Sequence, residues 1–196
     1  MNNFKTYRRI MKFDEVTTFR LINAFLVSIG MSLLTPVIVI LKGTLLPAWA
    51  ISMFGIINTL SVKTNAYFSK KTLNYLYKLG VVIHILFTLT ALLYFFNPFW
   101  MILIDSTLVI LEVAIFSAYG IVLNNHITNN FPQSMGDFQI VRNSTWADGT
   151  LIGLGLSIII TSLWGMPGMI ISFVAFNLCF SSWMIKNWNF YKSLGI

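Results

Sequence analysis

Three ionisable side chains, His84, Asp105 and Glu112, stand in stretches of sequence that are otherwise apolar. His84 precedes Pro98 of the turn sequence "NPF" by fourteen residues, and Glu112 follows Pro98 by the same number. If the flanking stretches are antiparallel helices, a rise of about 1.5 Å per residue puts both side chains about 21 Å from the turn. A carboxylate–imidazole contact is then possible where the two faces meet. Asp105 lies seven residues before Glu112, so it projects from nearly the same face, two turns further out.

Carboxylates in such positions suggest ion binding, proton transfer or recognition of a cation. An ionised carboxylate that faces lipid at a helix centre costs at least about 2.5–3.5 kcal/mol. We therefore expect Asp105 and Glu112 to face the bundle interior or a water-filled cavity, with His84 tuning their protonation. The alternative is a buried polar network that only fixes helix packing. One histidine with separated carboxylates is a poor zinc site. Because no catalytic motif is present, we expect neither an enzyme nor a cofactor.

The composition indicates which elements hold these residues. Of the 196 residues, 57% are hydrophobic and only 10% are charged, whereas a soluble domain has about 25% charged residues. This predicts an all-α, polytopic membrane protein with its transmembrane domain at residues 20–187. A basic N-terminal segment, 1–19, and a cytoplasmic tail, 188–196, would flank that domain. Apolar segments of about 20 residues predict six transmembrane helices, at residues 20–41, 46–62, 74–96, 99–123, 144–164 and 166–186.

The basic residues predict the orientation of these helices. Twelve of the 13 lie on one side of the predicted membrane, and only Lys42 lies on the other. Under the positive-inside rule both termini are cytoplasmic. The net charge of +7 is explained by anchoring at anionic lipid headgroups and requires no nucleic acid. Size and composition favour a bacterial inner membrane.

The predicted fifth helix begins with two further charged residues and two glycines. Asp148 follows Arg142 by six residues, and we expect it to form an interfacial ion pair with Arg142 or with an inner-loop lysine. That pair would hold the inner helix ends together or change partners as the protein changes conformation. Gly149 and Gly153 have the GxxxG spacing, which favours close helix packing within a chain or between chains.

The topology resembles one half of a major facilitator superfamily transporter over residues 16–188. Pro36 in the first helix and "RNSTWADGTLIGLGL" at the start of the fifth are similar in style to that family. The family has the pattern Gly-x-x-x-Asp-Arg/Lys-x-Gly-Arg/Lys-Arg/Lys between its second and third helices. Residues 61–70, "SVKTNAYFSK", occupy that position. Lys70 fits the last basic position, whereas Asn65 replaces the aspartate and neither glycine is present.

The resemblance implies a half-size transporter that works as a two-fold homodimer by alternating access, with its solute or ion between the halves. In the family, helices one and four line the central cavity. Glu112, Asp105 and His84 would then form the binding site. Two other functions fit the sequence. One is a bacteriocin or toxin immunity protein, or another membrane-embedded binding protein, that recognises its partner through helix contacts. The other is a subunit or regulator of a larger membrane complex.

Overall fold

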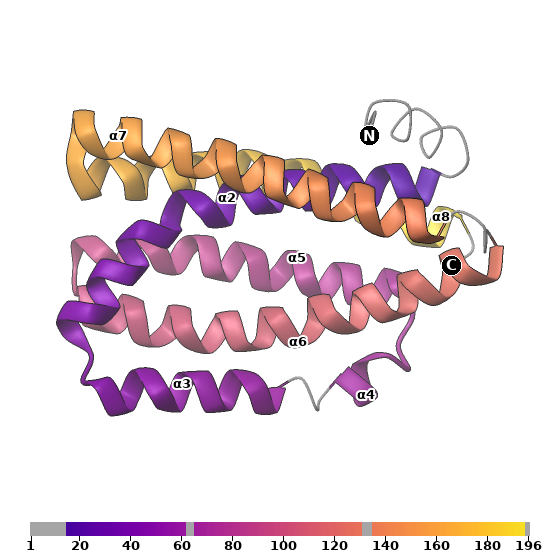
Figure 1. The fold of residues 1–196 in the computed structure, drawn as a ribbon, viewed down its shortest axis with the longest axis horizontal. Helices are drawn as coiled ribbons and strands as arrows, with labels where there is room; N and C mark the ends of the chain where they lie inside the picture. The colour runs from indigo at the N-terminus through magenta and orange to yellow at the C-terminus, as the bar shows by residue number, and fades with distance from the viewer. Residues whose placement is uncertain (1–14, 62–64, 131–134, 195–196) are drawn as a thin grey trace.

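The computed structural model describes residues 15–61, 65–130 and 135–194 (Figure 1). Within these residues the chain is all-helical and contains no strand. Most of the predicted basic segment, residues 1–14, lies outside the described part. In chain order the helices are α2 (Glu15–Leu45), α3 (Ala48–Ser61), α4 (Asn65–Phe68), α5 (Leu73–Thr90), the 3₁₀ helix η2 (Ala91–Phe95), α6 (Pro98–Asn130), α7 (Met135–Lys186) and α8 (Phe190–Ser193).

Four helical stretches in the described part are long and apolar enough to cross a membrane. They are α2, α5 together with η2, α6, and the stretch that contains α7. This confirms the all-helical, membrane-type class that the composition predicts. The six-span prediction goes further, because it also counts α3 and divides α7 in two. α3 has only 14 residues, or about 21 Å of helix, against a hydrocarbon core about 30 Å thick.

The 52-residue helix α7 is interrupted at Gly165, where φ is 65° and ψ is −165°. A positive φ is accessible to glycine because it has no Cβ, and Pro167 follows within the break. A straight helix of this length would extend about 78 Å, more than twice the thickness of the hydrocarbon core. Instead, the chain reverses direction, and the two parts of α7, residues 135–164 and 166–186, run in opposite directions along α2 (Figure 1).

Small residues bring the first part of α7 close to α2. A Cβ built on Gly153 would lie 2.6 Å from the carbonyl oxygen of Ile29 and 2.7 Å from the Cβ of Ser32. A Cβ on Gly149 would lie 2.7 Å from the carbonyl oxygen of Phe25. Any larger side chain at either glycine would force the helices apart. The predicted GxxxG pair is thus placed at a contact within one chain.

α2 changes direction in its second half, where it contains Pro36 (Figure 1). Proline cannot donate the helical hydrogen bond and clashes with the preceding turn, which bends a helix. The hydroxyl of the preceding residue, Thr35, donates to the carbonyl of Met31 at 2.8 Å, a bond that also favours bending. The bend carries the chain from the layer that contains α7 to α3, which packs beside α6.

Several predicted boundaries differ from the structure, and two of these differences enlarge the core. α6 continues to Asn130, seven residues beyond the predicted end at 123, because Leu123 and Ile127 are one helical turn apart and both are buried in the core. The segment expected to be a cytoplasmic tail contains α8, and its Tyr191 is fully buried. The ring of Phe190 stacks on that of Phe19 from α2, with centroids 4.0 Å apart. The end of the chain is therefore part of the helical bundle.

Candidate functional site

The hairpin of α5 and α6 sets the positions of His84, Asp105 and Glu112. Asn97 begins α6, and its side-chain oxygen accepts hydrogen bonds from the backbone N–H groups of Phe99 and Trp100, at 3.0 and 3.4 Å. An asparagine cap satisfies donors that the first helical turn would otherwise leave unpaired. Proline at the first helical position is compatible with the cap because its missing N–H needs no partner. The turn thus fixes the register between the two helices.

His84 and Glu112 meet across this hairpin, as their equal depth predicts. The Nδ1 atom of His84 lies 3.7 Å from Oε1 of Glu112, and the two side chains are only 1% and 5% exposed. This separation permits an ion pair but is too long for a hydrogen bond. Within the described residues, neither ring nitrogen of His84 nor Oε1 of Glu112 has a hydrogen-bonding partner. The carboxylate therefore faces the protein interior and keeps hydrogen-bonding capacity.

Asp105 is also buried, at 2% exposure, but it stands apart from this pair. Asp105 and His84 are not among the residues that line the cavity beside Glu112. Of the three residues grouped by the sequence, the structure thus brings two into contact and places only Glu112 at the cavity.

The structure does not join Asp148 to Arg142. Asp148 is exposed, and the guanidinium of Arg142 donates to the side-chain oxygen of the adjacent Asn143 at 3.4 Å. Six residues correspond to a rotation of about 600° around a helix with 3.6 residues per turn, which leaves the two side chains about 120° apart. The expected ion pair between Asp148 and Arg142 does not form in this structure, because one continuous helix points the two side chains in different directions.

A cavity of about 220 Å³ lies between α2, α6 and the first part of α7. Two charged residues, Glu112 and Arg20, are among those that line it. Most of the other lining side chains are apolar, and the exposed Trp146 brings the cavity near the surface of the single chain. The lining residues are Arg20, Val27, Met31, Val109, Glu112, Val113, Phe116 and Trp146.

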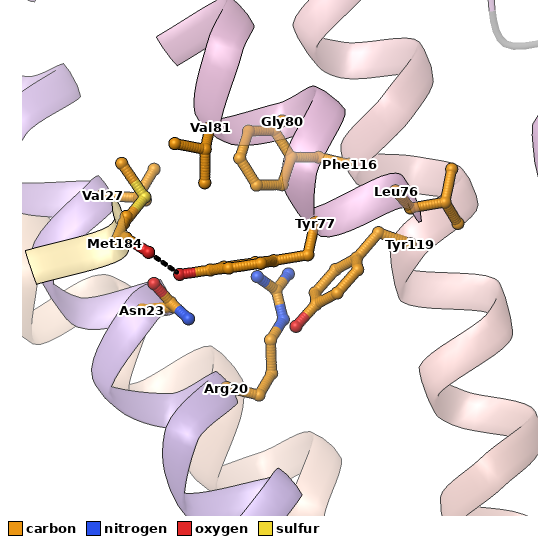
Figure 2. Close-up of a pocket in the computed structure, with 10 residues that line it drawn as sticks. All are labelled: Arg20, Asn23, Val27, Leu76, Tyr77, Gly80, Val81, Phe116, Tyr119 and Met184. Atoms are coloured by element: carbon orange, nitrogen blue, oxygen red, sulfur yellow. Dashed lines mark hydrogen bonds between the residues drawn. The ribbon is translucent and has the colours of Figure 1, made fainter. Parts of the chain in front are cut away.

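Arg20 was not expected in a site, because its position at the start of the first predicted span is typical of a membrane anchor. α2 begins five residues earlier, at Glu15, so Arg20 lies inside the helix. Its guanidinium carbon is 4.7 Å from the centre of the Tyr119 ring, a cation–π contact. Figure 2 shows the side chain rising between Tyr77 and Tyr119. The mostly apolar sequence around Arg20, "FRLINAF", was the one feature that could have indicated a position inside the helical bundle.

A second, smaller cavity of about 20 Å³ lies on the other side of Arg20, next to Asn23, Tyr77 and Tyr119 (Figure 2). This volume is enough for about one water molecule. The Tyr77 hydroxyl donates to the carbonyl of Met184 at 3.0 Å, which ties α5 to the second part of α7. Arg20, Val27 and Phe116 line both cavities. Their packing therefore separates the two spaces.

No protein-family model, curated protein sequence or solved structure matches this chain.

Proposed function

We propose that this protein is a half-size, transporter-like membrane protein that works as a homodimer and moves a small solute or cation by alternating access. The observation that carries the proposal is the position of Glu112, whose carboxylate is buried yet lines the wall of a cavity of about 220 Å³. Buried ionisable residues within a membrane belong by default to binding or transport pathways. In this proposal Glu112 binds the cationic group of the solute, and His84 assists by tuning the protonation of Glu112.

The proposed topology has six spans, with α3 and the two parts of α7 counted separately and both termini in the cytoplasm. α2 and α6 are then the first and fourth spans, the two that line the central cavity in major facilitator transporters. The exposed Trp146 lies at the same cavity. A second copy that packs on this side through a two-fold axis would close the cavity and supply its other wall.

Thiol accessibility in sealed vesicles tests whether water reaches the cavity from each side. In a Cys179→Ser background, Val113→Cys places a thiol at the cavity, and Ile115→Cys places one in the packed core. We expect a membrane-impermeant thiol reagent to modify the Val113→Cys protein from both sides and to leave the Ile115→Cys protein unmodified. Modification from neither side would refute the transport proposal. Modification from one side alone would refute alternating access and favour a membrane-embedded binding protein, such as an immunity protein.

Mass measurement of the intact chain in lipid nanodiscs tests the pairing. We expect two copies of the wild-type chain per disc. The measurement is made at protein concentrations at which the assay distinguishes monomers from dimers. Replacing the exposed Trp146 with arginine should convert dimers to monomers, because it would bury a charge in the proposed interface. Arginine in place of Leu163, which is exposed on the same part of α7 but does not line the cavity, serves as the control. A wild-type monomer would refute the homodimer.

A further inference from the structure

The cavity between α2, α6 and α7 carries one cation and one anion on otherwise largely apolar walls. Arg20 on α2 and Glu112 on α6 both line it. The other lining side chains are valines, Met31, Phe116 and Trp146. Charges are therefore the main features by which this space can distinguish one small solute from another.

Arg20 and Glu112 do not form an ion pair with each other within the described residues. The Arg20 guanidinium lies against the ring of Tyr119, which stands two helical turns after Glu112 on α6. Glu112 has His84 beside it instead. Within the described residues, Nε of Arg20 and Oε1 of Glu112 are buried without a hydrogen-bonding partner, so each charged group has unmet hydrogen-bonding capacity.

On the basis of the proposed function, we propose that the solute is a small zwitterion whose carboxylate binds Arg20 and whose ammonium group binds Glu112. A guanidinium binds a carboxylate through two parallel, charge-assisted hydrogen bonds. A solute with a single charge would leave the opposite protein charge uncompensated in apolar surroundings, which is unfavourable. A zwitterion compensates both charges at once, and its hydrocarbon portion contacts the valines and Phe116.

The volume of the cavity limits the size of this solute. A cavity of about 150 Å³ holds one molecule of benzene, so the cavity of about 220 Å³ accommodates a small ω-amino acid such as 4-aminobutyrate. The ammonium and carboxylate groups of such a solute stand at opposite ends of its hydrocarbon chain, so each can contact a different protein charge.

Calorimetric binding to the full chain in nanodiscs tests the charge requirement with three probes: 4-aminobutyrate, butylamine and butyrate. We expect 4-aminobutyrate to bind at least about tenfold more tightly than either singly charged probe, because it gains a second charge-assisted contact. Arg20→Gln should reduce the affinity for 4-aminobutyrate to that for butylamine. Glu112→Gln should reduce it to that for butyrate. Affinities for the three probes that agree within about twofold would overturn the proposal.

Matched variants separate recognition from folding. Glu15→Gln and Lys186→Gln remove an exposed anion and an exposed cation away from the cavity, and both should keep the tenfold preference. Arg20→Lys and Glu112→Asp preserve each charge and should keep part of the preference. Loss of the preference in Glu15→Gln and Lys186→Gln as well would overturn the assignment to Arg20 and Glu112.

The same preparations distinguish failure of this inference from failure of the proposed function. If Val113→Cys is modified from both sides and butylamine binding requires Glu112, but 4-aminobutyrate binds no more tightly, the transporter survives and the zwitterion is wrong. If Val113→Cys is modified from neither side, the transporter and the zwitterion site fail together.

Discussion

Replacing Gly153 with alanine tests the packing of α7 against α2, which forms one side of the cavity. The added Cβ would lie 2.6 Å from the carbonyl oxygen of Ile29 and 2.7 Å from the Cβ of Ser32. Carbon atoms normally approach an oxygen to about 3.3–3.6 Å and another carbon to about 3.5–4.0 Å. The two helices would therefore have to separate by roughly 0.7–1.3 Å. A gap of about that size forfeits a quarter to a half of each affected dispersion contact.

We expect Gly153→Ala to lower the free energy of unfolding by about 1–3 kcal/mol, the usual cost of inserting a methyl group into a packed contact. The higher helix propensity of alanine, worth about 1 kcal/mol, offsets part of this loss. Gly155→Ala provides the matched control, because a Cβ at Gly155 meets nothing within 4 Å. That variant gains the propensity without the clash, so it should be at least as stable as the wild type.

Reversible unfolding by sodium dodecyl sulfate in mixed micelles, followed by tryptophan fluorescence, measures both variants under the same conditions. The informative quantity is the difference in unfolding free energy between Gly153→Ala and Gly155→Ala, which we expect to be about 1–3 kcal/mol or more. Equal stability of the two variants would refute the close approach of α7 to α2, and with it the dimensions of the cavity that these helices enclose.

Three further substitutions test other contacts in the same unfolding assay. Tyr77→Phe removes the hydrogen bond to Met184 and should destabilise the protein by about 1 kcal/mol. Tyr75→Phe, which alters an exposed ring, should have no effect, so equal effects of the two variants would refute the buried hydrogen bond. Asn97→Ala removes the cap of α6 and should cost about 0.5–2 kcal/mol, and full restoration by Asn97→Ser would assign that loss to capping. Gly165→Ala places a Cβ on a residue with positive φ and should destabilise by about 1–2 kcal/mol; an unchanged stability would contradict the break in α7.

The contact between His84 and Glu112 could be predicted because they flank a short turn. Two antiparallel helices joined at "NPF" must place residues equidistant from the turn at equal depth, and the helical period fixes which faces they occupy. The same reasoning explains why Asp105 was grouped with Glu112 although it does not reach the cavity. Residues seven apart share a face, but they are separated by about 10.5 Å along the axis, and the cavity lining on α6 begins at Val109, one helical turn after Asp105.

The ends of the helices were less predictable, because membrane hydropathy and helix formation are different properties. The apolar run of α6 ends near residue 123, yet the helix continues through a polar segment to Asn130. Leu123 and Ile127 pack into the core and stabilise the extension. Similarly, a tail as short as residues 188–196 cannot form a span, so hydropathy gave no reason to expect α8, whose Tyr191 is buried among aromatic rings of the other helices.

Arg20 and the cavity could not be predicted, because they depend on the relative height of helices that are distant in the chain. No short turn joins α2 to α6, so the sequence gives no rule that places Arg20 beside Tyr119 or opposite Glu112. Their relative height is set by packing: the glycines of α7 bring that helix against α2, and the hairpin of α5 and α6 packs against both. An arginine that hydropathy assigns to a membrane anchor is thereby carried into the bundle. A charge near the end of a span therefore has to be judged from the helices that pack around it.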